Sequence, residues 1–130
     1  MFEIRLRPGQ DGDALFKSLR EGILDLSGAM PALNVAVELT RMSPGLDLPE
    51  SHELTKLCLD SMTEAGIAPS VARLATCTEA GQFFSKGYDA VAFGPGDPAE
   101  NGHGPNEQNS MDQIAKATTF YERLIEKVCV

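Results

Sequence analysis

A short apolar run that ends at two glycines around a proline most constrains how this chain can fold. Residues 90–93 read Ala-Val-Ala-Phe, and Gly94-Pro95-Gly96 follows at once. An apolar run of this length predicts a buried strand of a parallel sheet, and the glycines and proline force the backbone out into a loop. In open α/β sheets, ligands bind in loops at the carboxyl ends of the strands. The polar residues after Gly96 are therefore the first candidates for a functional site.

One histidine stands in this polar stretch. His103 lies seven residues after Gly96, between Gly102 and Gly104, and Pro105-Asn106-Glu107 follows it. Imidazole is a common metal ligand, but a loop histidine on its own is also typical of a solvated surface group. Position alone leaves both interpretations open.

The composition is that of an ordinary soluble globular protein. The chain has 130 residues, 42% hydrophobic and 23% charged, which suffices for one modest domain with its own core. No apolar run approaches the roughly 20 residues that span a bilayer, and charges interrupt the N-terminal segment too early for a signal peptide. We therefore expect a cytoplasmic protein without a membrane partner.

Charge and cysteine content exclude two further classes. The formal net charge of -8 argues against a nucleic-acid partner, because phosphates need compensating Lys and Arg. The three cysteines lack CxxC spacing, so neither a disulfide framework nor a cysteine-rich zinc site is indicated. Cys58 falls on the apolar face of a predicted helix and is most simply a small core residue.

The first third of the chain alternates between strand and helix patterns. Residues 2–7 and 35–40 alternate apolar and polar side chains, which predicts two half-buried strands. Between them, Asp11 and Asp13 are candidate N-caps of a helix that runs to about Leu24. This part therefore predicts a β-α-β unit.

A segment with two prolines and a glycine, residues 43–49, separates this unit from the rest. Beyond it, Ser51 is a candidate cap of a helix to about Ala65, and Ser110 opens a capping box for a helix to the chain end. Two apolar runs predict strands buried on both faces, with a short helix between them. The elements give an α/β class, β-α-β followed by α-β-α-β-α. In the second part, the strands are predicted at residues 71–75 and 89–93 and the short helix at residues 79–86.

The order of motifs resembles the zinc-dependent family of acetylornithine deacetylase, succinyl-diaminopimelate desuccinylase and aminoacylase. The resemblance is carried by Phe93-Gly94-Pro95-Gly96, by His103 with Pro105-Asn106-Glu107, and by the capped helix after them. Cys77-Thr78-Glu79-Ala80 resembles the acetylornithine deacetylase branch. The resemblance implies that residues 1–45 are half of a lid, or dimerisation, domain. Residues 46–130 are then the C-terminal part of a phosphorylase/hydrolase-like catalytic domain.

The same resemblance assigns roles to single residues. His103 corresponds to a ligand of zinc or cobalt, and Glu107 to a carboxylate that holds the ligating imidazole, unless Glu107 is simply solvated. Arg5 corresponds to a lid arginine that binds the substrate carboxylate, although a solvated arginine like Arg7 fits the strand equally well. A segment that lines the substrate pocket in the family corresponds to Cys77, Thr78 and Glu79. A purely structural interpretation explains the same pattern, with Thr78 as the N-cap of the following helix and Glu79 beside the positive end of the helix dipole.

The chemistry implied by the resemblance is the hydrolysis of N-acyl amino acids by a metal-bound water, as in arginine biosynthesis. That chemistry requires a His-x-Asp pair, a bridging aspartate and a glutamate pair, and this sequence has neither a His-x-Asp nor a Glu-Glu. One histidine cannot hold a catalytic zinc. We therefore expect a C-terminal piece of the hydrolase that is inactive and binds no metal tightly alone, or else a non-catalytic association module. Short strands with open edges predict a homo-oligomer, formed by strand pairing or by exchange across residues 43–49.

Overall fold

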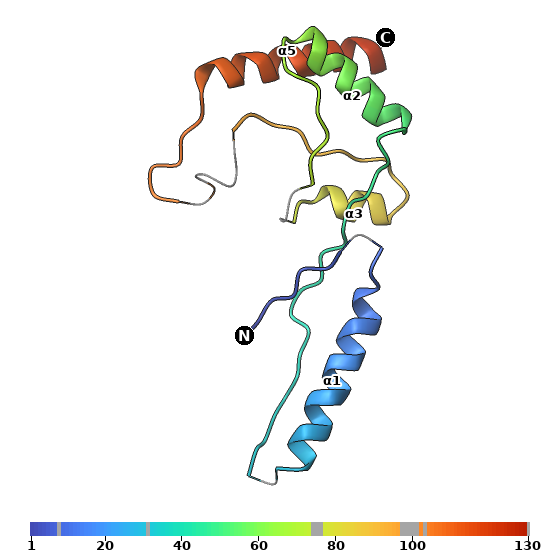
Figure 1. Ribbon diagram of the computed structural model, residues 1–130, viewed down its shortest axis with the longest axis vertical. Coiled ribbons are helices and arrows are strands. Elements are labelled where there is room, and N and C mark those ends of the chain that lie inside the picture. Colours follow the sequence, from blue (N-terminus) through green and yellow to red (C-terminus); the bar gives the residue numbers. More distant parts are fainter. Residues whose placement is uncertain (8, 31, 74–76, 97–101, 103, 130) are drawn as a thin grey trace. The chain divides into compact units, whose positions relative to one another are not determined.

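The computed structural model describes residues 1–7, 9–30, 32–73, 77–96, 102 and 104–129 (Figure 1). The chain divides into two compact units. Unit 1 comprises Met1–Asp47 and Ala75–Tyr88, and unit 2 comprises Leu48–Leu74 and Asp89–Val130. No helix in the described ranges is both long and apolar enough to cross a membrane. The predicted division into domains 1–45 and 46–130 stays a prediction.

The predicted α/β fold class is wrong, because the described residues form four α-helices and no β-strand. Within the described ranges, neither the predicted β-α-β half-lid nor the predicted α-β-α-β-α catalytic part is present as such. Residues 2–7 and 35–40 carry the alternating pattern but form no β ladder. A strand needs a neighbour for its N–H and C=O groups, and a two-stranded sheet is marginal in water.

The later strand predictions fail as well. Residues 89–93 are irregular, as are residues 71–73, and the rest of the predicted strand at 71–75 lies outside the described residues. Ala92 is exposed, and so is Val71, so the expected burial on both faces is absent. An apolar run records a tendency to be buried, but burial also requires covering elements.

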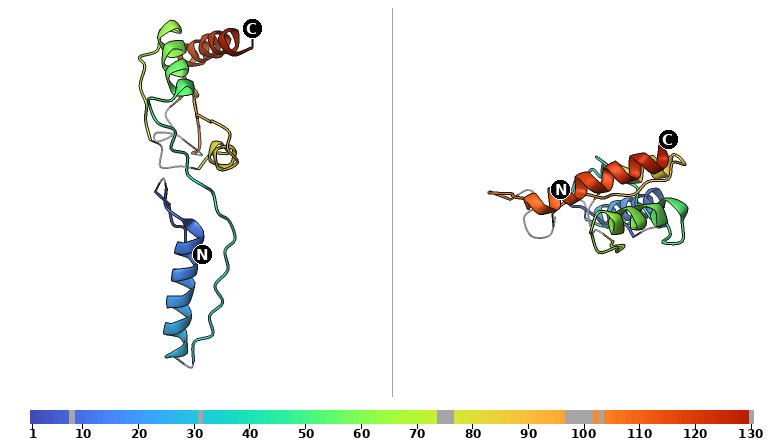
Figure 2. Two further views of the ribbon diagram at one scale, coloured as in Figure 1. Left: turned by 90° about the vertical axis from the view of Figure 1, so that its right-hand side faces the viewer. Right: turned by 90° about the horizontal axis from the view of Figure 1, so that it is seen from above.

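Unit 1 is built on helix α1, Gly12–Gly28. Asp11 caps it as predicted, accepting a hydrogen bond from Ala14 N at 3.0 Å, and the helix continues beyond Leu24. The extended chain from residue 32 to residue 40 runs alongside α1 in both side views (Figures 1 and 2). The predicted apolar stripe of α1 is half-buried, as are two side chains of the extended segment: Leu15, Phe16, Leu19 and Ile23, with Val35 and Val37.

The short helix α3, Ala80–Ser85, also belongs to unit 1 and lies against the backbone at Pro44. Gly81 is buried, and a Cβ placed on it would collide with the carbonyl oxygen of Pro44. The glycine is therefore required for close backbone approach.

We expect Gly81→Ala to destabilise unit 1 by about 1–3 kcal/mol, because a fixed backbone oxygen cannot move aside as a flexible side chain can. Gly22→Ala is the matched control. A Cβ at Gly22, inside α1, meets nothing within 4 Å, so this change is expected to stabilise by about 0.5–1 kcal/mol. Urea unfolding followed by circular dichroism measures both. Equal effects of the two substitutions would contradict the contact at Gly81.

Unit 2 is held by the packing of α2, Glu53–Glu64, against α5, Met111–Val128 (Figures 1 and 2). Cys58 is a core residue as predicted, and burial raises the pKa of its thiol, so the group stays neutral. Phe120 is fully buried, and its ring stacks on Phe93 at a centroid distance of 3.8 Å. The core of unit 2 consists of Cys58, Met62, Ala65 and Phe120, with Leu54, Leu59, Ile67, Val91, Phe93 and Leu124 around it.

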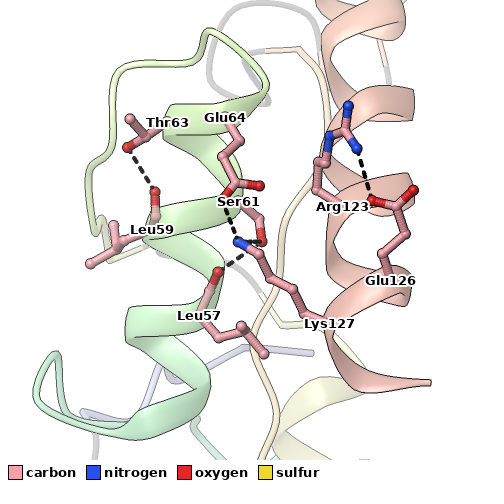
Figure 3. Close-up of polar contacts among 8 residues, drawn as sticks. All are labelled: Leu57, Leu59, Ser61, Thr63, Glu64, Arg123, Glu126 and Lys127. Carbon is pink, nitrogen blue, oxygen red and sulfur yellow. Dashed lines mark hydrogen bonds and ion pairs between the residues drawn. The ribbon is translucent and has the colours of Figure 1, made fainter. Parts of the chain in front are cut away.

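A polar contact fixes the register of the two helices (Figure 3). Lys127 of α5 reaches across to α2, where its Nζ lies 2.9 Å from Glu64 Oε1 and 3.4 Å from Ser61 Oγ. Ser61 is fully buried and donates its hydroxyl hydrogen to the Leu57 carbonyl at 2.9 Å. Because the lysine side chain is only 28% exposed, this pair is better placed to stabilise the packing than an ordinary surface ion pair.

Candidate functional site

The segment from residue 93 to residue 96 is tied to α5 at both of its ends. Tyr121 donates its hydroxyl hydrogen to the Phe93 carbonyl at 2.8 Å. Gly96 donates its N–H to Gln113 Oε1 at 3.0 Å, with a φ of +98° that favours glycine. The bend at residues 95–96 agrees with the loop that the sequence predicts after residue 93.

The predicted N-cap of α5 is confirmed, and Gln113, its hydrogen-bond partner, also contacts a loop outside the helix. Ser110 Oγ accepts a hydrogen bond from Gln113 N at 3.5 Å, which is the serine half of the predicted capping box. The side chain of Gln113 accepts the hydrogen bond from the Gly96 N–H, so it contacts the loop at Gly96 and not only its own helix. One glutamine thus joins the loop at Gly96 to the first turn of the helix.

Between this loop, the end of α2 and the first turns of α5 lies an open pocket of about 350 Å³. Its wall carries an ion pair, in which Lys116 Nζ lies 2.7 Å from Asp112 Oδ2. Because the two charges compensate each other, neither side chain offers an uncompensated charge to a ligand. The pocket has room for a small polar group, and among the described residues its ionisable side chains are those of Asp112 and Lys116.

His52 has a structural role that the sequence did not reveal. Its side chain is 32% exposed and caps α2 in place of Ser51. Its Nδ1 accepts from Leu54 N at 3.2 Å, and its Nε2 lies 3.5 Å from Asp89 Oδ1. Both ring nitrogens are thereby engaged, with the ring hydrogen of the neutral form facing the carboxylate.

Arg5 lies in the exposed N-terminal segment of unit 1. Its Nη2 lies 3.0 Å from Glu3 Oε1, and both side chains are more than half exposed. An exposed pair of this kind contributes little to stability, so a substrate carboxylate can compete with Glu3 for the guanidinium. The predicted role of Arg5 stays a prediction.

The segment Cys77-Thr78-Glu79 is exposed and leads into α3 in unit 1. Glu79, not Thr78, holds the N-cap position, with helical backbone angles and no side-chain cap hydrogen bond. The alternative interpretation of Thr78 as the helix cap is therefore wrong. The substrate-pocket interpretation of the three residues stays a prediction.

The predicted metal ligand His103 lies outside the described residues. Glu107, its expected partner, is exposed in the loop of unit 2 and follows Asn106, whose φ is +63°. Asn is among the few non-glycine residues that adopt this conformation readily. The predicted site residues in the described ranges are divided between the units, with Arg5 and residues 77–79 in unit 1 and Glu107 in unit 2.

The described residues do not fit a catalytic metal centre. Among them, no group of three His, Cys, Asp or Glu side chains is arranged to hold an ion. His52 uses one ring nitrogen as a helix cap and directs the other to Asp89. A catalytic zinc needs about three protein ligands, so the side chains placed here do not make one.

Comparison with known proteins identifies a family. The sequence profile of peptidase family M20/M25/M40 matches residues 3–127, which is nearly the whole chain. No match was found among curated proteins or among solved structures.

Proposed function

Because the chain belongs to peptidase family M20/M25/M40, we propose that it is part of a metallohydrolase that removes the acyl group from N-acyl amino acids. The family match over residues 3–127 is the observation that carries this proposal. Within the family, the Cys77-Thr78-Glu79-Ala80 motif favours acetylornithine as the substrate and arginine biosynthesis as the setting. Zinc or cobalt is the metal we expect in the active enzyme.

In this proposal the chain contributes substrate-binding groups and one metal ligand. Arg5 binds the substrate carboxylate, Cys77, Thr78 and Glu79 line the pocket, and His103 ligates the metal with Glu107 behind it. The sequence has no His-x-Asp pair and no Glu-Glu pair, so the other ligands have to come from polypeptide beyond these 130 residues.

A second candidate function is a non-catalytic association module of the same family. The missing ligand pairs favour it, since a chain without them has no hydrolytic chemistry of its own. The joint presence of His103, Arg5 and the residue 77–79 motif favours the hydrolase, because an association surface has no need of all three. Activity of a polypeptide that contains this chain together with both ligand pairs discriminates between the two.

The proposed role of Arg5 gives a test with a substrate-dependent readout. In the zinc- or cobalt-loaded hydrolase that contains this chain, Arg5→Ala is expected to raise KM for N-acetylornithine about tenfold or more. Loss of a charge-assisted pair with a carboxylate costs on the order of 1.5–3 kcal/mol. The carboxamide analogue of N-acetylornithine carries no carboxylate, so its KM is expected to change little.

Arg7→Ala is the matched control, because Arg7 is also exposed and stands two residues further along the same segment. It is expected to leave both substrates unaffected. An equal rise in KM for the carboxylate and the carboxamide would refute the assignment of Arg5. Absence of acyl release from any N-acyl amino acid by the metal-loaded hydrolase would refute the proposed function itself.

A further inference from the structure

The N-cap of α2 is a side chain that loses its acceptor when it gains a proton. Ser, Thr, Asp and Asn are the usual N-cap residues, and each keeps an acceptor oxygen near neutral pH. Here Ser51 precedes the helix, yet it is His52 Nδ1 that accepts the hydrogen bond from Leu54 N, at 3.2 Å. An imidazole nitrogen accepts only while it carries no hydrogen, and imidazoles become doubly protonated between about pH 8 and 5. This cap therefore exists with the neutral ring only.

The other ring nitrogen has the opposite preference. His52 Nε2 lies 3.5 Å from Asp89 Oδ1, and the two side chains are 32% and 57% exposed. A positive ring attracts this carboxylate more strongly than a neutral ring does. The positive end of the α2 dipole, by contrast, repels a positive ring. Protonation thus weakens the contact of the ring with its own helix and strengthens its contact with Asp89.

The other charges around the ring do not remove this opposition. Within four positions of His52, the helix side contributes two carboxylates and one ammonium group, those of Glu50, Glu53 and Lys56. Asp89 is the charged group that faces the ring from the other segment. Carboxylates and ammonium groups keep their charge near neutral pH, so the imidazole is the group that changes. The excess negative charge favours a positive ring, in the same direction as Asp89.

The backbone turn before α2 does not depend on the state of the ring. The Pro49 carbonyl accepts hydrogen bonds from His52 N and from Thr55 Oγ1, both at 3.0 Å. Thr55 is buried, and neither its hydroxyl nor the backbone groups titrate near neutral pH. A change in the partners of the ring is therefore confined to the imidazole, the Leu54 N–H and the Asp89 carboxylate.

We propose that His52 is a pH-dependent switch between these two partners. In the neutral ring, Nδ1 caps α2 while the hydrogen on Nε2 faces Asp89. In the positive ring, the cap is released and the ring is held by Asp89 through a charge-assisted contact. Leu48 and Asp89 are the first residues of the two segments that form unit 2, so the switch acts where both segments begin. Acidification loosens the first turn of α2 and tightens its link to residues 89–93.

Nuclear magnetic resonance of the whole isotope-labelled chain, from about pH 8 to about pH 5, tests the proposal. At the alkaline end, His52 Nδ1 is expected to show the shift of a nitrogen without hydrogen, and Nε2 that of an N–H. On acidification, the Leu54 amide proton is expected to lose its hydrogen bond with the same midpoint as the ring nitrogens. Its protection against hydrogen exchange is expected to fall about fivefold, the factor that corresponds to a typical N-cap.

Two variants separate the two contacts of the ring. His52→Asn supplies a cap oxygen that does not titrate, so the Leu54 amide is expected to keep its hydrogen bond over the whole range. Asp89→Asn keeps the cap but removes the carboxylate, so Leu54 should still respond to pH, with the midpoint moved to lower pH.

Three results would overturn the proposal. The first is a Leu54 amide that does not follow the titration of the ring, or that responds to pH unchanged in His52→Asn. The second is a neutral ring with its hydrogen on Nδ1, and the third is an Asp89→Asn variant with an unchanged midpoint. None of these results bears on hydrolase activity.

Discussion

Phe120→Ala is expected to unfold unit 2 or leave it barely stable. Phe120 is fully buried in the core between α2 and α5, and its ring stacks on Phe93. Removing a buried phenylalanine costs about 3–5 kcal/mol, because apolar contacts are lost and a cavity is left. A unit of this size has a total stability of only several kcal/mol, at roughly 0.05–0.15 kcal/mol per residue.

Thermal and urea unfolding monitored by circular dichroism measure this loss, and the unfolding midpoint is expected to fall in both. Phe83→Ala is the matched control, since Phe83 is 59% exposed on α3 and its removal should cost less than about 1 kcal/mol. Tyr121→Phe is expected to lie between them, at about 0.5–1.5 kcal/mol, for the hydrogen bond to Phe93. A loss below 1 kcal/mol for Phe120→Ala would show that the α2–α5 core does not hold the unit together.

The helices were predictable because their determinants are local in sequence. Asp11 and Ser110 both cap the helices that the sequence assigned to them, and Cys58 lies in the core as its place in the apolar stripe indicates. Each of these features depends on residues within three or four positions. The predicted cap Ser51 was displaced by its neighbour His52, whose ring nitrogen accepts the hydrogen bond instead.

The strands were not predictable in the same way, because a strand exists only through its partner. The alternation in residues 35–40 describes burial only in part, since Val35 and Val37 are half-buried but Leu39 is exposed, as is Glu38. It does not specify a neighbouring strand, and the described chain supplies none. An extended segment can run beside a helix instead of another strand, as this segment runs beside α1 (Figure 2).

The contacts of the candidate site were likewise not predictable from local sequence patterns. Sequence patterns identified the bend at Gly96 and the cap at Ser110, but not that Gln113 joins the two across 17 positions. Nor did they pair His52 with Asp89, which lies 37 positions further along the chain. Such contacts arise from packing, and neither residue carries a local signal for them. The assignment of His103 rests on motif order alone, so it requires a functional experiment.

His103→Ala is expected to lower kcat/KM of the metal-loaded hydrolase that contains this chain by more than about 100-fold. Loss even of a side chain that only supports a metal ligand costs about 10–100-fold, and loss of the ligand itself should exceed that range. The bound metal, measured by elemental analysis after dialysis, should fall in parallel. This readout separates a weakened metal site from a misplaced substrate, which would leave the metal content unchanged.

The other histidine provides the control within the same chain. His52→Ala removes the cap of α2, so it is expected to lower the free energy of unfolding by about 1 kcal/mol. Metal content and kcat/KM should stay close to those of the natural protein, because both ring nitrogens of His52 are engaged within unit 2. The two substitutions should thus separate cleanly, one acting on metal and activity and the other on stability. Equal losses of metal from both variants, or full metal content in His103→Ala, would show that the ligand has been misassigned.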